Sequence, residues 1–315
     1  MDLPWGPSLA LAQTDQETPL DAVLDYEPRT GRVGLATSPG AGEMAFLDYG
    51  PADRTPDLVF LHANGFNARA YRTILAPLAT SLRILTPDQR GHGATTLPTD
   101  YPRTSWLDLK DDLLAFLEVM GIGRVALSGH SMGGTASLLA AAEAPERVRA
   151  LALLEPVIRP PGTMQASSEA IGLSPMVQGA LRRRRVFPSR AAAVDGYRGR
   201  GAFSTWTEAM LKDYVAAGFH DLPDGTVTLA CTPEWEVSNY VSQDHDIWAA
   251  FEASRCPIRI LRAGRESPGR LDEGLERLTA TGRIRVDTVP DTTHFLPMER
   301  PELVREAILE AVAAP

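Results

Sequence analysis

The chain has 315 residues, 44% of them hydrophobic, so it is long enough to bury a large core and to form one catalytic domain with an insertion. Its formal net charge of −9 argues against nucleic acid or an anionic membrane as the main partner. No apolar run approaches the roughly 18–20 residues of a transmembrane helix.

The first 42 or so residues, rich in Pro, Gly, Asp and Thr, predict an arm over the core, followed by an edge strand near residues 31–35. The acidic Asp2 stands where a signal peptide would be basic. Residues 10–12, Ala-Leu-Ala, resemble a cleavage site, but the segment before them lacks a charged region. We therefore expect a cytoplasmic protein whose two cysteines are free thiols, a disulfide being the alternative.

An apolar run at residues 57–61 predicts a buried strand, and the loop 62–66, His-Ala-Asn-Gly-Phe, follows it. A second apolar run at residues 124–127 is followed by the pentapeptide 129–133, Gly-His-Ser-Met-Gly, and then by a long Ala/Leu-rich stretch. This is the G-x-S-x-G pattern of a nucleophile elbow, a turn so tight that nearly side-chain-free residues must flank the serine, here Ser131.

The two loops together predict an oxyanion hole. We expect the backbone N–H groups of Asn64 and Met132 to point at one spot above Ser131. Each such donor is typically worth on the order of 2.7–4 kcal/mol of transition-state stabilisation. Ala63 and His130, beside these donors, are expected to contact the substrate. The alternative for the first loop is an ordinary exit from a strand.

The candidate general base comes near the end of the chain. Residues 284–289 predict a last strand, and the loop after it carries His294, before a helix opened by Pro301. Among the six histidines, His294 is the only one that follows every predicted core strand, so it can reach back to the elbow. The others are expected to make structural hydrogen bonds or to lie in a middle insertion.

These motifs resemble the α/β-hydrolase family over roughly residues 43–313, including the loop Asp-Gln-Arg-Gly-His-Gly at 88–93. The resemblance implies an α/β fold with a mostly parallel eight-stranded sheet, helices on both faces and a helical cap inserted after the sixth strand. It also implies a triad in the order serine, acid, histidine. The implied domains are an N-terminal arm with the first part of the core (1–156), the cap (157–251) and the second part of the core (252–315).

The triad acid has two candidates. Most family members carry an aspartate after the seventh strand, but here the strand at 258–262 is followed by a loop that contains Glu266 and no aspartate. Glu155 follows the sixth strand, 24 residues after Ser131. That placement resembles the acid site of haloalkane dehalogenases and resorcylic-lactone hydrolases, so we favour Glu155 over Glu266.

The predicted cap holds many aromatic residues, most of which a small helical layer needs for packing. Some must face the elbow, and Trp206 and Trp235 are the expected substrate contacts. The run Arg182-Arg183-Arg184-Arg185 suits either a clamp for an acidic substrate or a solvated helix face. We favour the solvated face, because the surrounding insertion has no basic excess.

A serine at the elbow must attack an acyl carbon, which argues against dehalogenase and epoxide hydrolase chemistry. The leading hypothesis is a carboxylesterase or lactonase for a hydrophobic, aromatic or alkyl, small molecule. A carbon–carbon bond hydrolase or enol-lactonase of aromatic degradation is second, and a non-catalytic hydrolase-like receptor third. No metal or cofactor is expected, since the sequence has no H-E-x-x-H or Cys/His cluster. A homodimer is compatible with the sequence.

Overall fold

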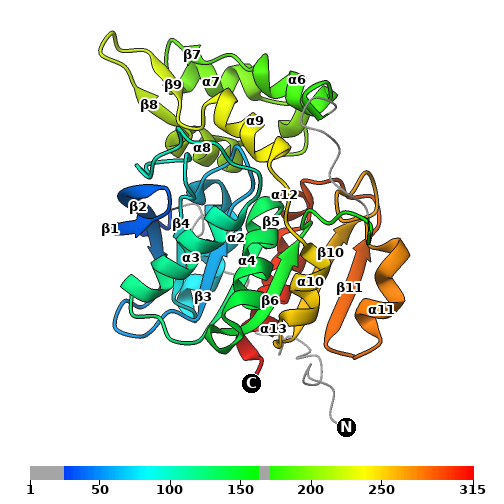
Figure 1. Cartoon of the computed structure of the whole chain (residues 1–315). Helices are drawn as coiled ribbons and strands as arrows, with labels where there is room; N and C mark the ends of the chain where they lie inside the picture. Colours follow the sequence, from blue (N-terminus) through cyan, green and yellow to red (C-terminus); the bar gives the residue numbers. More distant parts are fainter. Residues whose placement is uncertain (1–24, 163–170) are drawn as a thin grey trace.

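The computed structural model describes residues 25–162 and 171–315, so the segment 10–12 and most of the predicted arm lie outside the described residues. Its centre is an eight-stranded sheet (Figure 1). The strands of this sheet are β1 (Arg29–Thr37), β2 (Gly40–Tyr49), β3 (Leu58–Leu61), β4 (Ile84–Pro87), β5 (Val125–His130), β6 (Val148–Leu154), β10 (Ile258–Ala263) and β11 (Ile284–Val289).

The strand order is β1-β2-β4-β3-β5-β6-β10-β11. The pairs β1–β2 and β2–β4 are antiparallel, and every other neighbouring pair is parallel. The predicted fold class is confirmed. Carboxyl ends of parallel strands meet at one edge of the sheet, where ligands bind in folds of this kind.

Helices cover both faces of the sheet (Figure 1), so the central strands β3 and β5 are buried on both sides. Leu58 and Phe60 belong to a core cluster with residues of α2 and α13, whereas Val59 and Leu61 belong to one with α3, α4 and α10. The helices of the core are α2 (Arg72–Leu75), α3 (Leu107–Val119), α4 (Met132–Glu143), α10 (Ile247–Ala253), α11 (Leu275–Thr279), α12 (Leu296–Glu299) and α13 (Pro301–Ala313), with 3-10 turns η1 (Ala68–Tyr71), η2 (Ala76–Thr80), η3 (Pro145–Arg147) and η5 (Asp272–Gly274).

The segment between β6 and α10 forms a layer over the carboxyl ends of the parallel strands (Figure 1). Besides helices it contains a three-stranded antiparallel sheet, in the order β7-β9-β8, that the sequence pattern did not predict. The last residues of the predicted cap range, 247–251, lie in α10, which packs in the core with α4. The elements of the cap are α6 (Pro175–Leu181), β7 (Val186–Phe187), α7 (Arg190–Tyr197), η4 (Gly201–Phe203), α8 (Glu208–Ala217), β8 (Phe219–Asp221), β9 (Val227–Leu229) and α9 (Pro233–Val241).

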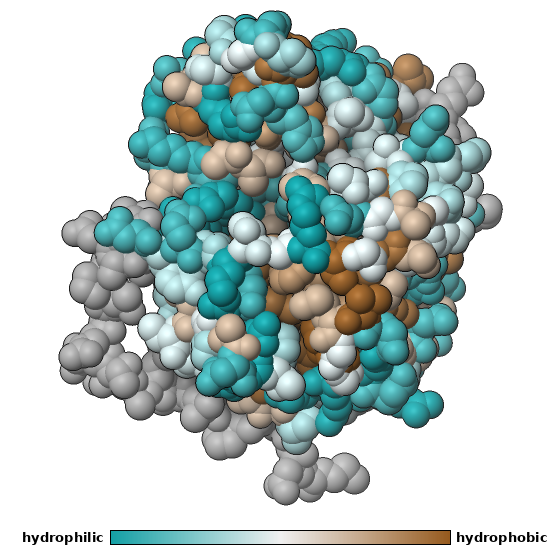
Figure 2. All heavy atoms as spheres, turned by 90° about the vertical axis from the view of Figure 1, so that its left-hand side faces the viewer, coloured by the Kyte–Doolittle hydropathy of each residue, from teal (hydrophilic) through white to brown (hydrophobic). Residues whose placement is uncertain are grey.

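The face that carries β1 and β2 is mainly hydrophilic, with a hydrophobic area near its middle (Figure 2). Among the residues that the structure describes, none of the helices is both long and apolar enough to cross a membrane. Cys231 and Cys256 are buried and unpaired with each other.

The turn between β5 and α4 depends on close approach of three backbone segments. A Cβ at Gly133 would lie 2.5 Å from the carbonyl oxygen of Leu61 and 2.6 Å from that of His62, at the end of β3. Real Cβ atoms do not come this close to backbone oxygen, so only glycine lets α4 start against β3. The serine that precedes α4 is thereby held at the edge of the sheet.

We expect Gly133→Ala to destabilise the protein by about 2 kcal/mol, since a contact this close to backbone belongs at the upper end of the roughly 1–3 kcal/mol that overpacking costs, and alanine in a helix gains only about 1 kcal/mol. Urea unfolding measures the change. The control is Gly34→Ala in β1, where an added Cβ meets nothing within 4 Å. A Gly133→Ala protein as stable as wild type would contradict this account of the turn.

Candidate active site

Ser131 lies between β5 and α4, at the carboxyl end of β5, and it lines a cavity together with residues of the cap. Its φ of 55° is in the left-handed region, a conformation that costs a non-glycine residue on the order of 1–3 kcal/mol. Its N–H donates to the carbonyl of Leu154 at the end of the neighbouring β6, with an N–O distance of 2.9 Å. The chain thus stores strain in the residue that the sequence singles out as the nucleophile.

His294 lies in the loop between β11 and α12, with its ring between a hydroxyl and a carboxylate. Its Nε2 is 3.0 Å from Oγ of Ser131, and its Nδ1 is 3.2 Å from Oε2 of Glu155. An ionised carboxylate only accepts hydrogen bonds, so Nδ1 carries the proton and Nε2 accepts the serine proton. The ring is therefore oriented to act as a base toward Ser131.

Glu155 directly follows β6, and its side chain is fully buried. Its Oε1 accepts the N–H of Ala263 at 2.5 Å and the hydroxyl of Ser267 at 2.7 Å, while Oε2 faces His294. Burying a carboxylate without partners costs several kcal/mol, and these three donors offset that cost. Ala263 is the last residue of β10, and Ser267 lies in the loop that follows it.

Glu266, the alternative acid, lies in the loop after β10, and its side chain is exposed. It lines the cavity above the serine, but the structure gives it no hydrogen bond to His294. The structure thus brings Ser131, His294 and Glu155 together and leaves Glu266 outside this line of hydrogen bonds.

The two expected oxyanion donors border the same space. Asn64 and Met132 line the cavity beside Ser131. Met132 is the first residue of α4, so its N–H has no acceptor one turn earlier in the helix. The Asn64 side chain donates from Nδ2 to the carbonyl of Glu236 (2.9 Å) and accepts at Oδ1 from Nδ2 of Asn239 (2.8 Å). Cap helix α9 therefore contacts the oxyanion loop directly.

A cavity of about 840 Å³ lies between the cap and the edge of the sheet, above Ser131. Its wall is mostly apolar and aromatic, and it includes the expected contacts Ala63 and His130. Phe66 and Phe295, which the sequence analysis missed, follow the oxyanion loop and His294 so closely that their positions in the sequence could have indicated them. The remaining large apolar or aromatic lining residues are Trp106, Met132, Val157, Met176, Tyr197, Phe203, Tyr214 and Tyr240.

The two tryptophans expected to contact the substrate do not line this cavity. Trp206 packs edge-to-face against the lining residue Phe66, with ring centroids 5.3 Å apart. Trp235 is buried where the cap meets the core, its Nε1–H donating to the carbonyl of Arg90 at 2.8 Å and its ring lying 4.6 Å from the guanidinium of Arg103. These predictions were wrong because both rings hold the cap together or hold it onto the core.

The sequence profile described as "Alpha/beta hydrolase family" matches residues 58–307, which is most of the chain. The chain belongs to the alpha/beta hydrolase family. The family resemblance noted from the motifs is therefore confirmed.

Curated relatives match over a shorter span. The 2-(acetamidomethylene)succinate hydrolase of Mesorhizobium japonicum is 30% identical over 101 residues, 32% of this chain and 35% of that protein. The 2-hydroxymuconate semialdehyde hydrolase of Pseudomonas sp. strain CF600 is 34% identical over 102 residues, 31% of this chain and 35% of that protein. The alignments span about a third of the length of these relatives. A crystal structure of E-2-(acetamidomethylene)succinate hydrolase has a TM-score of 0.73 at 19% identity, covering 91% of this chain and 100% of that one, which shows the shared fold.

One arginine of the run 182–185 faces the interior of this hydrolase. Arg183 lines the cavity, pairs with the carboxylate of Glu236 and donates from Nη2 to the Tyr214 hydroxyl at 2.7 Å. The other three are exposed, and Arg185 pairs with Glu234 on the surface. The run follows the end of α6, so the expected helix face is not formed. Exposure to solvent holds for three of the four arginines and fails for Arg183, which no pattern in the run distinguishes from its neighbours.

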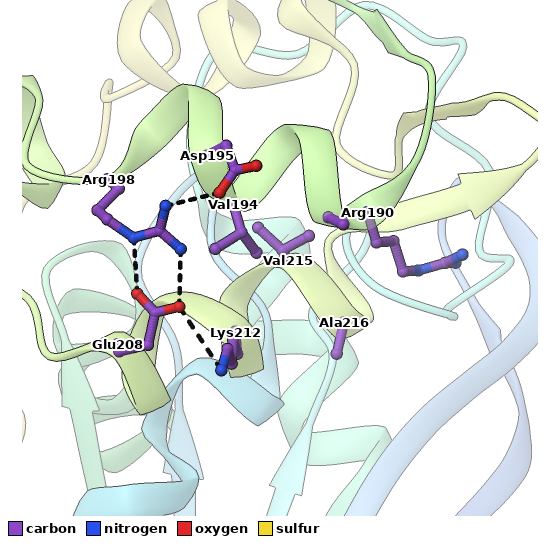
Figure 3. Close-up of a pocket in the computed structure, with 9 residues that line it drawn as sticks. Arg190, Val194, Asp195, Arg198, Glu208, Lys212, Val215 and Ala216 are labelled. Carbon is purple, nitrogen blue, oxygen red and sulfur yellow. Dashed lines mark hydrogen bonds and ion pairs between the residues drawn. The ribbon is translucent and has the colours of Figure 1, made fainter.

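A second hollow, of about 440 Å³, lies between α7 and α8 on the cap (Figure 3). Arg198 bridges Asp195 and Glu208 there, and Lys212 also lies 3.6 Å from Glu208 (Figure 3). These charges pair with one another across the hollow, and its lining contains none of the candidate catalytic residues. Within the described ranges, no group of three His, Cys, Asp or Glu side chains could hold a metal ion.

Three buried histidines, each with a neutral ring, form hydrogen bonds that hold the loops of the site. Burial lowers the pKa of His62 to about 4 and lowers the pKa values of His92 and His130 well below the usual range. Each ring uses both nitrogens. His62 accepts from the N–H of Gln89 and donates to the carbonyl of Ala63. His92 accepts from the N–H of Gly65 and donates to the carbonyl of Arg90. His130 accepts from the Tyr71 hydroxyl and donates to the carbonyl of His294.

We expect stability to fall as the pH drops below about 6.5, because the unfolded chain then binds protons that the folded protein excludes from these histidines. Asp88 acts in the opposite direction, since burial raises its pKa to about 6 and the folded protein takes up that proton first. Burial also raises the pKa values of Asp112 and Asp213, which act in the same direction as Asp88. These carboxyls offset only part of the loss from the three histidines and from His245, whose pKa burial lowers to about 4. The free energy of unfolding should therefore be roughly 2–4 kcal/mol lower at pH 5.5 than at pH 7.5.

Urea unfolding at the two pH values tests this expectation. The control is His220→Gln, which removes an exposed histidine and should leave the pH dependence unchanged. Equal unfolding free energies at pH 5.5 and 7.5 would show that the buried rings do not stay neutral.

Proposed function

We propose that this alpha/beta hydrolase is a serine hydrolase that cleaves a carboxylic ester or lactone of a hydrophobic small molecule through an acyl-enzyme. The supporting observation is the hydrogen-bonded line from Ser131 through His294 to the buried Glu155, which opens onto a largely apolar cavity. Such a line activates a serine hydroxyl for attack on an acyl carbon.

In the proposed mechanism His294 takes the Ser131 proton at Nε2 while Oγ attacks the acyl carbon. Glu155 keeps the ring in the required tautomer and stabilises the imidazolium that forms. The tetrahedral oxygen lies near the N–H groups of Asn64 and Met132, which stabilise its negative charge. His294 then protonates the leaving alcohol, and water attacks the acyl-enzyme by the same route in reverse.

The lining of the cavity supports an uncharged, hydrophobic acyl group. Aromatic and aliphatic side chains dominate it, and its two arginines, Arg183 and Arg200, are matched by two glutamates, Glu236 and Glu266. Because Glu236 pairs directly with Arg183, that guanidinium is not a free anion-binding group. The lining therefore favours a neutral ester or lactone over a substrate with several carboxylates.

A carbon–carbon bond hydrolase is the second candidate. The relative named 2-hydroxymuconate semialdehyde hydrolase favours it, and so do the arginine side chains at the cavity wall. It would use the same nucleophile and base, and it requires a substrate carboxylate to compete with Glu236 for Arg183. The pairing of these two residues makes this the weaker candidate.

Hydrolysis by wild type and Ser131→Ala tests the proposed reaction. Release of p-nitrophenol from acyl esters of increasing chain length, run beside a set of lactones, should depend entirely on Ser131 and should increase for longer alkyl or aromatic acyl groups that fill the apolar cavity. Thermal melting checks that the variant folds. Hydrolysis near the wild-type rate by Ser131→Ala would exclude the mechanism, and an inactive wild type would favour the carbon–carbon hydrolase or a receptor.

Glu155→Gln and Glu266→Gln form a matched pair that tests the acid. We expect Glu155→Gln to lower kcat by about 10⁴, as in serine proteases whose triad aspartate is replaced by its amide, because His294 loses the acceptor that fixes its tautomer. Glu266→Gln should change kcat only a few-fold. Steady-state kinetics on the best ester measures both, and small losses of equal size would show that neither carboxylate has this role.

A further inference from the structure

The side chain of Asn64 is held by two hydrogen bonds from a single cap helix. Its Nδ2 donates to the backbone carbonyl of Glu236, and its Oδ1 accepts from Nδ2 of Asn239, at 2.9 and 2.8 Å. Both partners lie on α9, although Asn64 follows strand β3 of the core. The cap therefore holds the side chain of Asn64, the residue whose backbone N–H is proposed as an oxyanion donor.

The direction of every amide in this contact is fixed. Arg103 donates to Oδ1 of Asn239, and a guanidinium can only donate, so Nδ2 of Asn239 must face Asn64. Arg103 is itself held by Asp108 at 2.6 Å, and its side chain is nearly fully buried. Asn239 is fully buried as well. The contact between Asn64 and α9, called the clamp below, thus has a single hydrogen-bonding arrangement. Arg103, in the loop before α3, fixes it.

A second cap helix supports the residues next to Asn64. The Tyr214 hydroxyl of α8 donates to the carbonyl of Gly65 at 3.1 Å, and the Tyr214 carbonyl accepts from Nδ2 of Asn67 at 2.9 Å. On the core side, Gly65 donates its N–H to His92. The oxyanion loop is therefore fixed between the core and two helices of the cap.

We propose that Asn239 is a positioning residue that, through the Asn64 side chain, aims the Asn64 backbone N–H at the developing oxyanion. This inference rests on the proposed function, because it gives the cap a part in the chemical step as well as in covering the substrate. Oxyanion donors act only within about 2.7–3.1 Å of the charged oxygen, so a small rotation of the loop lowers the rate. Binding of the ground-state ester depends far less on the direction of the Asn64 N–H than stabilisation of the tetrahedral state does.

The test compares Asn239→Ala, Asn239→Asp and Asn64→Ala with wild type on the best p-nitrophenyl ester. Asn239→Asp can still accept from Arg103 but cannot donate to Asn64, and Asn64→Ala keeps the backbone N–H while losing both clamp bonds. Each variant should lower kcat at least about 10-fold, since loss of a whole donor costs about 10²–10³. KM should change less than about 2-fold, because ground-state contacts remain.

The affinity for phenylboronic acid, which forms a tetrahedral adduct with an active serine, should fall in proportion to kcat. The control is Glu234→Gln, on the exposed side of the same helix, where the Glu234 side chain is 61% exposed and pairs with Arg185. It should match wild type in kcat and in boronic acid affinity. Thermal melting shows whether each variant folds. If Asn239→Ala does not fold, Asn239→Asp and Asn64→Ala test the positioning role without it.

The outcomes separate this inference from the proposed function. Turnover that depends on Ser131 but is unchanged in folded Asn239→Asp and Asn64→Ala overturns the positioning role alone. A rise in KM with kcat and boronic acid affinity unchanged also overturns it, because Asn239 would then act on substrate binding. A wild-type protein without Ser131-dependent turnover overturns the proposed function and this inference together.

Discussion

The arrangement of the site and of the core around it depends on the burial of one carboxylate, that of Glu155. Glu155 is removed from water at the end of β6, and it is tolerated there only because the end of β10, the loop behind it and His294 all supply donors. Those three donors belong to the part of the chain that follows the cap, whereas Glu155 precedes it. The same interaction therefore joins the two halves of the core and fixes the orientation of the histidine.

The cap is tied into this arrangement by polar contacts that also shape the cavity. The ion pair of Arg183 with Glu236 balances charge in a wall that is mostly apolar, and α9 reaches the oxyanion loop through Asn239. A cap connected in this way is part of the site's geometry. In the mechanism proposed above, substrate selection and the alignment of the reacting groups consequently depend on the same helices.

The sequence predicted what local patterns determine. Apolar runs located the strands, the glycines around Ser131 marked the elbow, and the position of His294 after the last strand placed it within reach of the serine. Glu155 could be favoured over Glu266 because its placement after the sixth strand resembles the acid site of haloalkane dehalogenases and resorcylic-lactone hydrolases. The lining of the cavity could not be predicted, because the direction of Arg183 and the burial of Trp235 arise from contacts between cap and core that no single segment encodes.

The placement of Glu155 before the cap has a consequence for how the fold can diversify. Nucleophile, oxyanion loop and carboxylate all lie on one continuous stretch of chain whose strands β3, β5 and β6 are neighbours in the sheet. Of the proposed catalytic groups, only His294 follows the cap in the sequence, so the chain must return to the serine after the insertion. A cap of another length would therefore leave the spacing between Ser131 and Glu155 unchanged, and the positioning role proposed above would require that cap to supply a hydrogen-bonding partner for Asn64. The spacing between serine and acid is thus independent of the cap, whereas the conformation of the oxyanion loop is not.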